Sequence, residues 1–199
     1  MGRAAAISFA QAGASHITLG ARSSLDSIKN EVIAAAAAAK RPAPKILCLK
    51  LDMTSQSSTE DAAKMIEKEF WKLDITVIYA GIVGAMEKIV DSDPEVWWNT
   101  FTVNLKGPYL ITRAILPLML KDGDKTIVTV SSVGAHLTSP TLSAYQPSKL
   151  AVLRFMEFVG AEYGDQGVVA YCVHPGNVVT DILGGEEGIP PALRQGECA

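Results

Sequence analysis

The chain of 199 residues has few cysteines and histidines, no strong excess of either charge and no long apolar run. Its three cysteines, Cys48, Cys172 and Cys198, are an odd number without the spacing of a disulfide framework, so we expect reduced thiols. The three histidines are scattered without the short spacing of zinc ligands, and no metal site is expected. A formal net charge of −3 lacks the basic footprint of a nucleic-acid-binding protein.

Membrane and secretion signals are also lacking. No apolar run reaches the roughly 18 residues of a membrane-spanning helix, and the first residues lack the basic-then-apolar layout of a signal peptide. We therefore expect a cytoplasmic protein that binds neither membrane nor nucleic acid. With 48% hydrophobic and 20% charged residues, the composition is that of an ordinary globular α/β protein, and the length suits one domain over residues 1–199.

Apolar runs typical of strands alternate with helical patterns along the chain. The expected strands are 16–22, 45–52, 75–82, 126–132 and 168–175, and the expected helices are 1–14, 25–39, 58–72, 94–104, 109–120 and 144–163. This alternation predicts an open, doubly wound parallel sheet with helices on both faces. Residues 183–199 are rich in glycine and proline and are expected to form an irregular tail.

One segment carries residues that can do chemistry. A strand that ends at Ser132 is followed by a helix with Tyr145 and Lys149 four residues apart, on one helical face. An ammonium beside a phenol favours the phenolate, which makes Tyr145 a candidate general acid/base near neutral pH. Ser132 could hydrogen-bond the same carbonyl or alcohol oxygen.

In their order, these residues resemble the classical short-chain dehydrogenase/reductase family over nearly the whole chain. Asn104 in FTVNLKGPYL comes first, then Ser132, then the Y-Q-P-S-K motif of Tyr145 and Lys149. The resemblance implies hydride transfer between a nicotinamide cofactor and an alcohol or carbonyl substrate. Tyr145 would exchange a proton with the substrate oxygen, and Ser132 would orient that oxygen. Lys149 would lower the tyrosine pKa and bind the nicotinamide ribose, while Asn104 would hold a relay water.

The resemblance also implies a cofactor site. The implied contacts are Gly2 at the pyrophosphate, Arg22 and Ser23 at the adenosine ribose, Asp52 and Met53 at the adenine, Ala80 and Gly81, Tyr145 and Lys149, and Pro175, Gly176, Val178 and Thr180 at the nicotinamide. An arginine at position 22 suits a 2′-phosphate, so NADP(H) is favoured over NAD(H). A second interpretation stays open for each of two residues. Arg22 would then be a solvated residue at a strand end, and Asp52 would be part of the N-terminal cap of the next helix.

The sequence departs from the family pattern at three places. Only Gly2 represents the glycine-rich turn that normally precedes the first helix. Ile78 and Tyr79 stand where the family has an asparagine pair, so Tyr79 is either a stacking residue near the cofactor or a structural substitution. A first central strand and a last helix and strand are expected to be missing. Unpaired edges on strands 16–22 and 75–82 would then make this chain a poorly stable protein and a poor enzyme.

The rival functions differ in what they require of the chain. A truncated, non-catalytic remnant of the fold would bind cofactor poorly. A lyase or epimerase would need a larger substrate domain than 199 residues allow. No G-x-S-x-G motif surrounds Ser132, which argues against a serine hydrolase. Since family members pair through helices that correspond to 94–119 and 145–163, a homodimer is expected.

Overall fold

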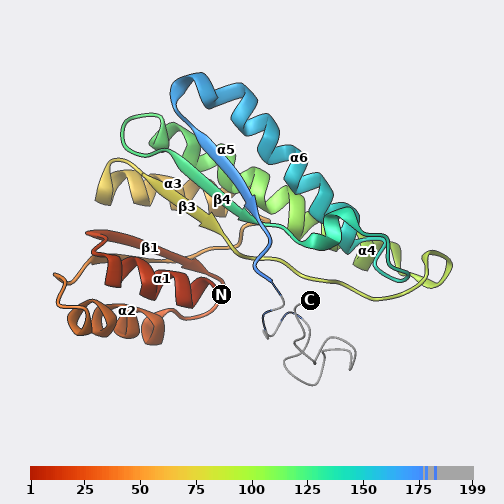
Figure 1. Cartoon of the computed structure of the whole chain (residues 1–199), viewed down its shortest axis with the longest axis horizontal. Helices are drawn as coiled ribbons and strands as arrows, with labels where there is room; N and C mark the ends of the chain where they lie inside the picture. The colour runs from red at the N-terminus through yellow and green to blue at the C-terminus, as the bar shows by residue number, and fades with distance from the viewer. Residues whose placement is uncertain (177, 179–181, 183–199) are drawn as a thin grey trace.

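The computed structural model describes residues 1–176, 178 and 182 (Figure 1). In chain order the elements are α1 (Gly2–Ala12), β1 (His16–Ala21), α2 (Asp26–Ala38), β2 (Lys45–Lys50), α3 (Gln56–Phe70), β3 (Ile75–Ile78), the 3-10 turn η1 (Ile89–Asp91), α4 (Pro94–Phe101), the π-helical segment η2 (Thr102–Lys106), α5 (Gly107–Met119), β4 (Thr126–Val130), the 3-10 turn η3 (Val133–His136), α6 (Tyr145–Tyr163), the 3-10 turn η4 (Gly164–Gln166) and β5 (Val169–Val173). None of the helices in these residues is long and apolar enough to cross a membrane.

All strand pairing is parallel, and it divides the described strands into two groups. β1 pairs with β2, and β4 lies between β3 and β5. Helices connect the successive strands, so the predicted Rossmann-like α/β architecture is confirmed. Within the described residues, β1 pairs only with β2 and β3 only with β4, as expected from the sequence for these two strands.

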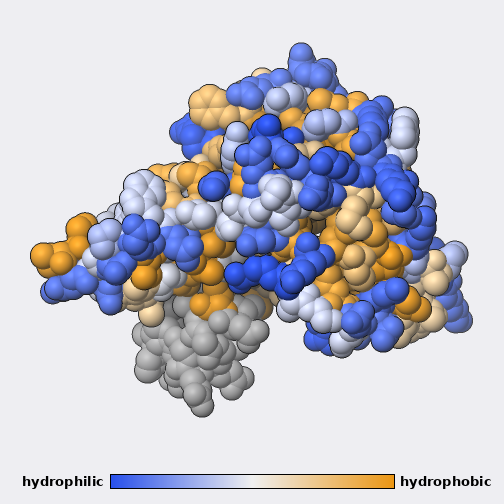
Figure 2. Space-filling view, turned by 180° about the vertical axis from the view of Figure 1, so that it is seen from behind, coloured by the Kyte–Doolittle hydropathy of each residue, from blue (hydrophilic) through white to orange (hydrophobic). Residues whose placement is uncertain are grey.

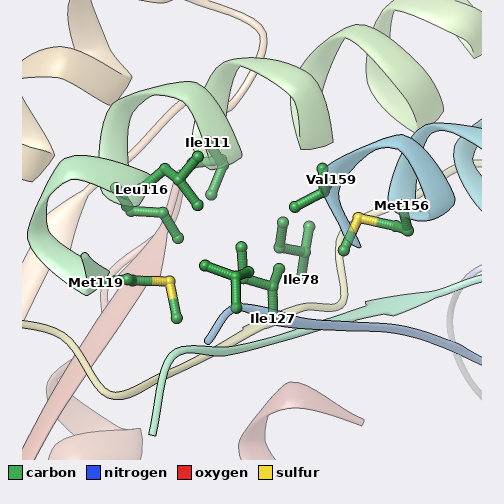
Figure 3. Packing of buried hydrophobic residues seen from close by; sticks show 9 residues of the cluster. Ile78, Ile111, Leu116, Met119, Ile127, Met156 and Val159 are labelled. Carbon is green, nitrogen blue, oxygen red and sulfur yellow. The ribbon is translucent and has the colours of Figure 1, made fainter. Parts of the chain in front are cut away.

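The larger core lies between the three-stranded group and helices α5 and α6 (Figure 3). Ile78 and Ile127 project from β3 and β4 against Ile111 and Met119 of α5 and Met156 of α6. Ile127 and Met119 are completely buried. This packing holds α6, which begins at Tyr145, against the three-stranded group.

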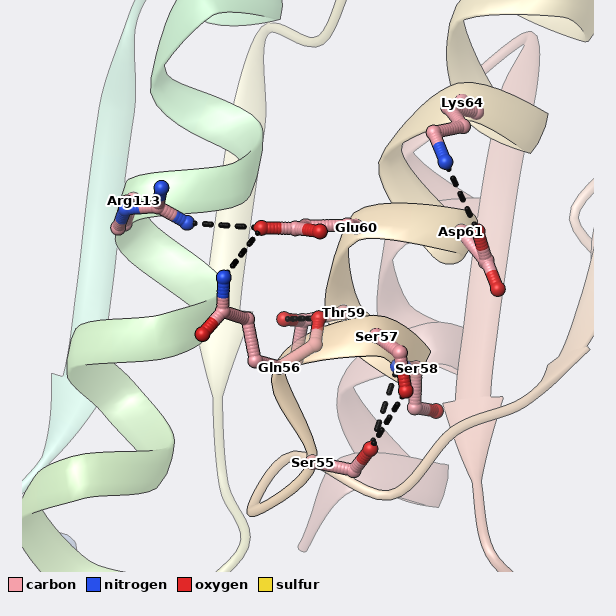
Figure 4. Close-up of polar contacts among 9 residues, drawn as sticks. All are labelled: Ser55, Gln56, Ser57, Ser58, Thr59, Glu60, Asp61, Lys64 and Arg113. Carbon is pink, nitrogen blue, oxygen red and sulfur yellow. Dashed lines mark hydrogen bonds and ion pairs between the residues drawn. The ribbon is translucent and has the colours of Figure 1, made fainter.

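A smaller core holds α1 and α2 on the two-stranded group, and α3 links it to α5. Leu49 of β2 and Leu118 of α5 belong to one cluster with apolar residues of α3. The α3 carboxylate of Glu60 also accepts hydrogen bonds from Arg113 of α5, at 2.9 Å, and from Gln56 (Figure 4). The two strand groups are thus joined through α3. Apolar side chains also remain on the surface, where Figure 2 shows them in patches between hydrophilic ones.

Local signals placed several helix ends correctly. Gly13 ends α1 in the left-handed conformation at φ 97°, and Asp93 caps α4 with Pro94 in its first turn, as predicted. The expected interruption at residues 105–108 is wrong, because η2 continues α4 into α5 without a break. Pro108, which has no N–H to donate, comes directly after the π-helical segment, where the α-helical bonding pattern is already altered. Pro117 lies inside α5, which ends two residues later.

Candidate active site

The carboxyl end of β4 carries two serines with different partners. The Ser131 hydroxyl donates to the Lys149 carbonyl at 2.9 Å, which ties this strand end to α6. The Ser132 Oγ caps η3 and accepts the Gly134 N–H at 3.0 Å. Its own proton is not used by that contact, so Ser132 keeps a donor for another oxygen.

Lys149 lies in the interior, between α6 and the end of β4. Its side chain is 4% exposed, and Nζ donates to the Val130 carbonyl at 3.0 Å. Nζ also lies 5.7 Å from the centroid of the Tyr145 ring, so the predicted pairing on one helical face is present. Burial lowers the pKa of Lys149 from 10.5 to about 8, which leaves it largely protonated at pH 7. The ammonium has two further N–H groups for other acceptors.

Asn104 is buried in η2, and its side-chain amide makes three hydrogen bonds. Nδ2 donates to the Ile82 carbonyl at 2.8 Å and to the Ser148 Oγ at 3.0 Å, while Oδ1 accepts the Ile82 N–H at 2.9 Å. The π-helical segment turns this side chain toward the loop after β3. Because both amide protons are taken, a relay water could not be held by these N–H groups.

Gly81 lies where these groups converge. A Cβ at this position would come 3.2 Å from both the Asn104 Oδ1 and the Lys149 Nζ. Ser148 completes the cluster, since its hydroxyl donates to the Tyr145 carbonyl at 2.6 Å and accepts from Asn104. The backbone at Gly81 therefore lies close to Asn104 and Lys149, and Ser148 connects Asn104 to the backbone of Tyr145.

On the cofactor side, Gly2 begins α1, and no side chain of the described residues caps this helix. Tyr79 packs against it, because a Cβ on Gly2 would lie 3.4 Å from the tyrosine ring. Burial raises the pKa of the Tyr79 phenol. The substitution is thus accommodated by packing next to the free N–H groups of the α1 N-terminus.

Arg22 and Ser23 are exposed immediately after β1. Among the described residues no hydrogen bond or ion pair engages the Arg22 guanidinium. The pKa of Asp52 is lowered mainly by hydrogen bonds from Thr54, and the charge of Arg22 adds to this effect. Asp52 Oδ1 accepts the Thr54 N–H and hydroxyl at 2.9 and 2.7 Å. Ser55, not Asp52, is the N-cap of α3.

Met53 and the last implied contacts differ in accessibility. Met53 is partly buried and packs against Gly107 of α5, where an added Cβ would lie 2.5 Å from the Met53 Cε. Ala80, Pro175, Gly176 and Val178 are exposed. Thr180 lies outside the described residues.

No role was predicted from the sequence for Ser131, Ser148 or Gln146, although each contacts this site. The available signal was position: Ser148 and Gln146 lie within Y-Q-P-S-K, and Ser131 precedes Ser132. Among the described residues, no group of three or more His, Cys, Asp or Glu side chains could hold a metal ion. The site is therefore built from hydroxyl, amide and ammonium groups.

Comparison with known proteins defines the class. The family model for short chain dehydrogenases matches residues 1–187, so the chain belongs to the short chain dehydrogenase family. The short chain dehydrogenase pigC of Monascus ruber is 50% identical over 189 residues, which are 95% of this chain and 62% of the relative. The short chain dehydrogenase tazN of Aspergillus terreus is 51% identical over 194 residues, 96% of this chain and 41% of the relative. The chain thus spans less than two thirds of these relatives.

Solved structures share the fold. A short chain dehydrogenase from Salmonella enterica serovar Typhi has a TM-score of 0.83 at 24% identity, covering 96% of this chain and 78% of that one. One from Shigella flexneri, complexed with NADP, has a TM-score of 0.81 at 25% identity, covering 91% and 74%. NAD+-bound xylitol dehydrogenase has a TM-score of 0.76 at 20% identity, covering 87% and 65%. The neighbours therefore include binders of either cofactor.

Proposed function

We propose that this chain carries the site of an oxidoreductase that transfers a hydride between NADP(H) and an alcohol or carbonyl substrate. The observation that carries the proposal is the position of Lys149. Its buried ammonium lies beside the Tyr145 ring and at the end of the strand that leads to Ser132. In the proposed reaction this charge would attract the negative charge that develops on the Tyr145 oxygen as its proton leaves.

The proton step would be carried out by the side chains of this chain. In carbonyl reduction the Tyr145 hydroxyl would donate its proton to the substrate oxygen, and Ser132 would donate a hydrogen bond to the same oxygen. Lys149 would stabilise the phenolate that remains. Asn104 would act by holding Ile82 and Ser148 in place, since its amide is occupied by them. The nicotinamide cofactor, when bound, supplies or accepts the hydride.

The residues present fit such a cofactor. The uncapped N-terminus of α1 offers free N–H groups to a pyrophosphate, and two N–H groups of Lys149 are available for ribose hydroxyls. At Gly81 an added Cβ would lie 3.2 Å from the Lys149 Nζ and the Asn104 Oδ1, so a side chain there would crowd the lysine. A preference for NADP(H) is supported by Arg22, which is exposed and suited to a 2′-phosphate.

A homodimer, a single domain over residues 1–199 and a cytoplasmic location are further parts of the proposal. Dimerisation through α5 and α6 is supported by exposed apolar side chains there: Tyr109 is 46%, Leu150 47% and Phe158 57% exposed. The cytoplasmic location is supported by the free thiols of Cys48 and Cys172, the state favoured in the cytosol.

Replacing Tyr145 with phenylalanine tests the function. NADPH oxidation would be followed with a panel of small ketones and aldehydes, and NADPH binding would be titrated by fluorescence. Removal of the proton donor should lower turnover by roughly 10²–10⁴ while binding persists. Activity within a few-fold of the parent would refute the role of Tyr145. A parent chain that fails to bind NADPH would instead support the non-catalytic remnant.

A further inference from the structure

The side chain of Gln146 holds the segment between Ser132 and Tyr145 at Ser139. Its Oε1 accepts the Ser139 N–H at 2.8 Å, and its Nε2 donates to the Ser139 Oγ at 3.2 Å. The Gln146 N–H also donates to the Leu142 carbonyl at 3.0 Å. Gln146 is only 7% exposed, so these contacts are shielded from competing water.

The same side chain supports the turn that carries Ser132. A Cβ on Gly134 would lie 3.4 Å from the Gln146 Cγ and 3.2 Å from the Ser132 Oγ. The Gly134 N–H is the group that donates to the Ser132 Oγ. Gln146 therefore contacts the backbone that orients the serine hydroxyl, and it follows Tyr145 directly in α6.

Two other residues show that the segment between Ser132 and Tyr145 depends on tertiary contacts. Thr141 has φ 71°, in the left-handed region that β-branched residues rarely adopt. Backbone of this kind persists where surrounding contacts determine it, and it is common near active sites. The Ser143 Oγ accepts the Trp97 indole N–H at 3.1 Å, which fixes the end of the segment next to α6.

We propose that Gln146 is a positioning residue, which fixes the Ser132 hydroxyl relative to the Tyr145 hydroxyl through Ser139 and Gly134. This inference rests on the proposed function, because it assigns Gln146 a role in that reaction. Gln146 touches the supporting backbone and does not itself donate a proton to substrate. Its loss should therefore lower kcat and leave cofactor binding unchanged.

The test compares Gln146→Met, Gln146→Glu and Gln146→Ala in the 199-residue chain. Methionine keeps the packing on Gly134 but loses both Ser139 bonds, whereas glutamate can accept from the Ser139 N–H and hydroxyl. Alanine loses both kinds of contact. Gln56→Met is the matched control, since it removes an amide that donates to Glu60 on the surface of α3, away from Ser132 and Tyr145.

Two measurements are made: kcat with the most reactive carbonyl substrate, and hydrogen exchange of the Ser139 and Gly134 amides by NMR. Since a displacement of about 1 Å can cost 10²-fold, we expect kcat to fall about tenfold in Gln146→Met, further in Gln146→Ala, and to recover partly in Gln146→Glu. Exchange should accelerate at Ser139 in Gln146→Met and also at Gly134 in Gln146→Ala. Gln56→Met should match the parent.

Two results would overturn the inference. One is a kcat in Gln146→Met that equals that of the parent although Ser139 exchange has accelerated. Loss of the Ser139 hydrogen bonds would then not affect the reaction. The other is Gly134 exchange that stays at the parent rate in Gln146→Ala. The second result comes from amide exchange and needs no activity measurement. It therefore applies even where the parent reduces no carbonyl and the proposed function itself has failed.

Discussion

Replacing Lys149 with methionine should remove activity while making the stability of the chain less dependent on pH. The lysine pKa is lowered by burial from 10.5 to about 8. At about 1.4 kcal/mol for each tenfold change in proton affinity, the protonated side chain costs the folded state about 3 kcal/mol at neutral pH. Methionine fills similar space and carries no such cost.

The sign follows from the two pKa values. Below pH 8 the lysine is protonated in both states, and the folded state bears the whole cost. Between pH 8 and 10.5 the unfolded chain binds more protons, so the stability of the parent rises with pH relative to Lys149→Met. The Val130 carbonyl loses its donor in the variant at a cost of about 1–3 kcal/mol, but that loss is present at every pH.

The assay is urea unfolding of parent and variant at pH 7, 8, 9 and 10. We expect the variant to be as stable as the parent or up to about 2 kcal/mol more stable at pH 7, from the burial cost less the hydrogen bond. That advantage should decline by most of the 3 kcal/mol as the pH approaches 10. Lys64→Met, on the exposed surface of α3, controls for the loss of one positive charge. A difference between parent and Lys149→Met that stays constant with pH would refute the burial argument.

Three further predictions concern other parts of the molecule. Arg22→Asp should weaken or reverse a preference in affinity for NADPH over NADH, because a guanidinium contact to the 2′-phosphate becomes a repulsion. Equal affinities of the parent for both cofactors would contradict this role of Arg22. Asn104→Asp should destabilise the fold by about 1–3 kcal/mol in urea unfolding at pH 7, since acceptors would then face the Ile82 carbonyl, and parent-like stability would contradict the observed bonding. Phe158→Glu should convert the expected dimer to a monomer in analytical ultracentrifugation, and a parent that sediments as a monomer would argue against an α5–α6 interface.

Much of the fold could be predicted because its signals are local. Gly13 and Asp93 mark helix ends through backbone conformation and capping, which depend on a few neighbouring residues. The alternation of apolar strands with helices predicted parallel pairing. The continuous passage from α4 into α5 was missed, because Gly107 and Pro108 usually interrupt a helix. The packing of Met53 against Gly107 leaves no room for a larger residue there, and the π-helical segment precedes Pro108.

The candidate site divides in the same way. The sequence by itself determined that Tyr145 and Lys149 share a helical face, since that follows from four-residue spacing. Only the tertiary structure decided that Lys149 is buried against the Val130 carbonyl and that Asn104 binds Ile82 and Ser148. These partners are distant in the chain and meet because α5 and α6 pack on the strands, so their hydrogen bonds and the lowered lysine pKa cannot be read from local spacing.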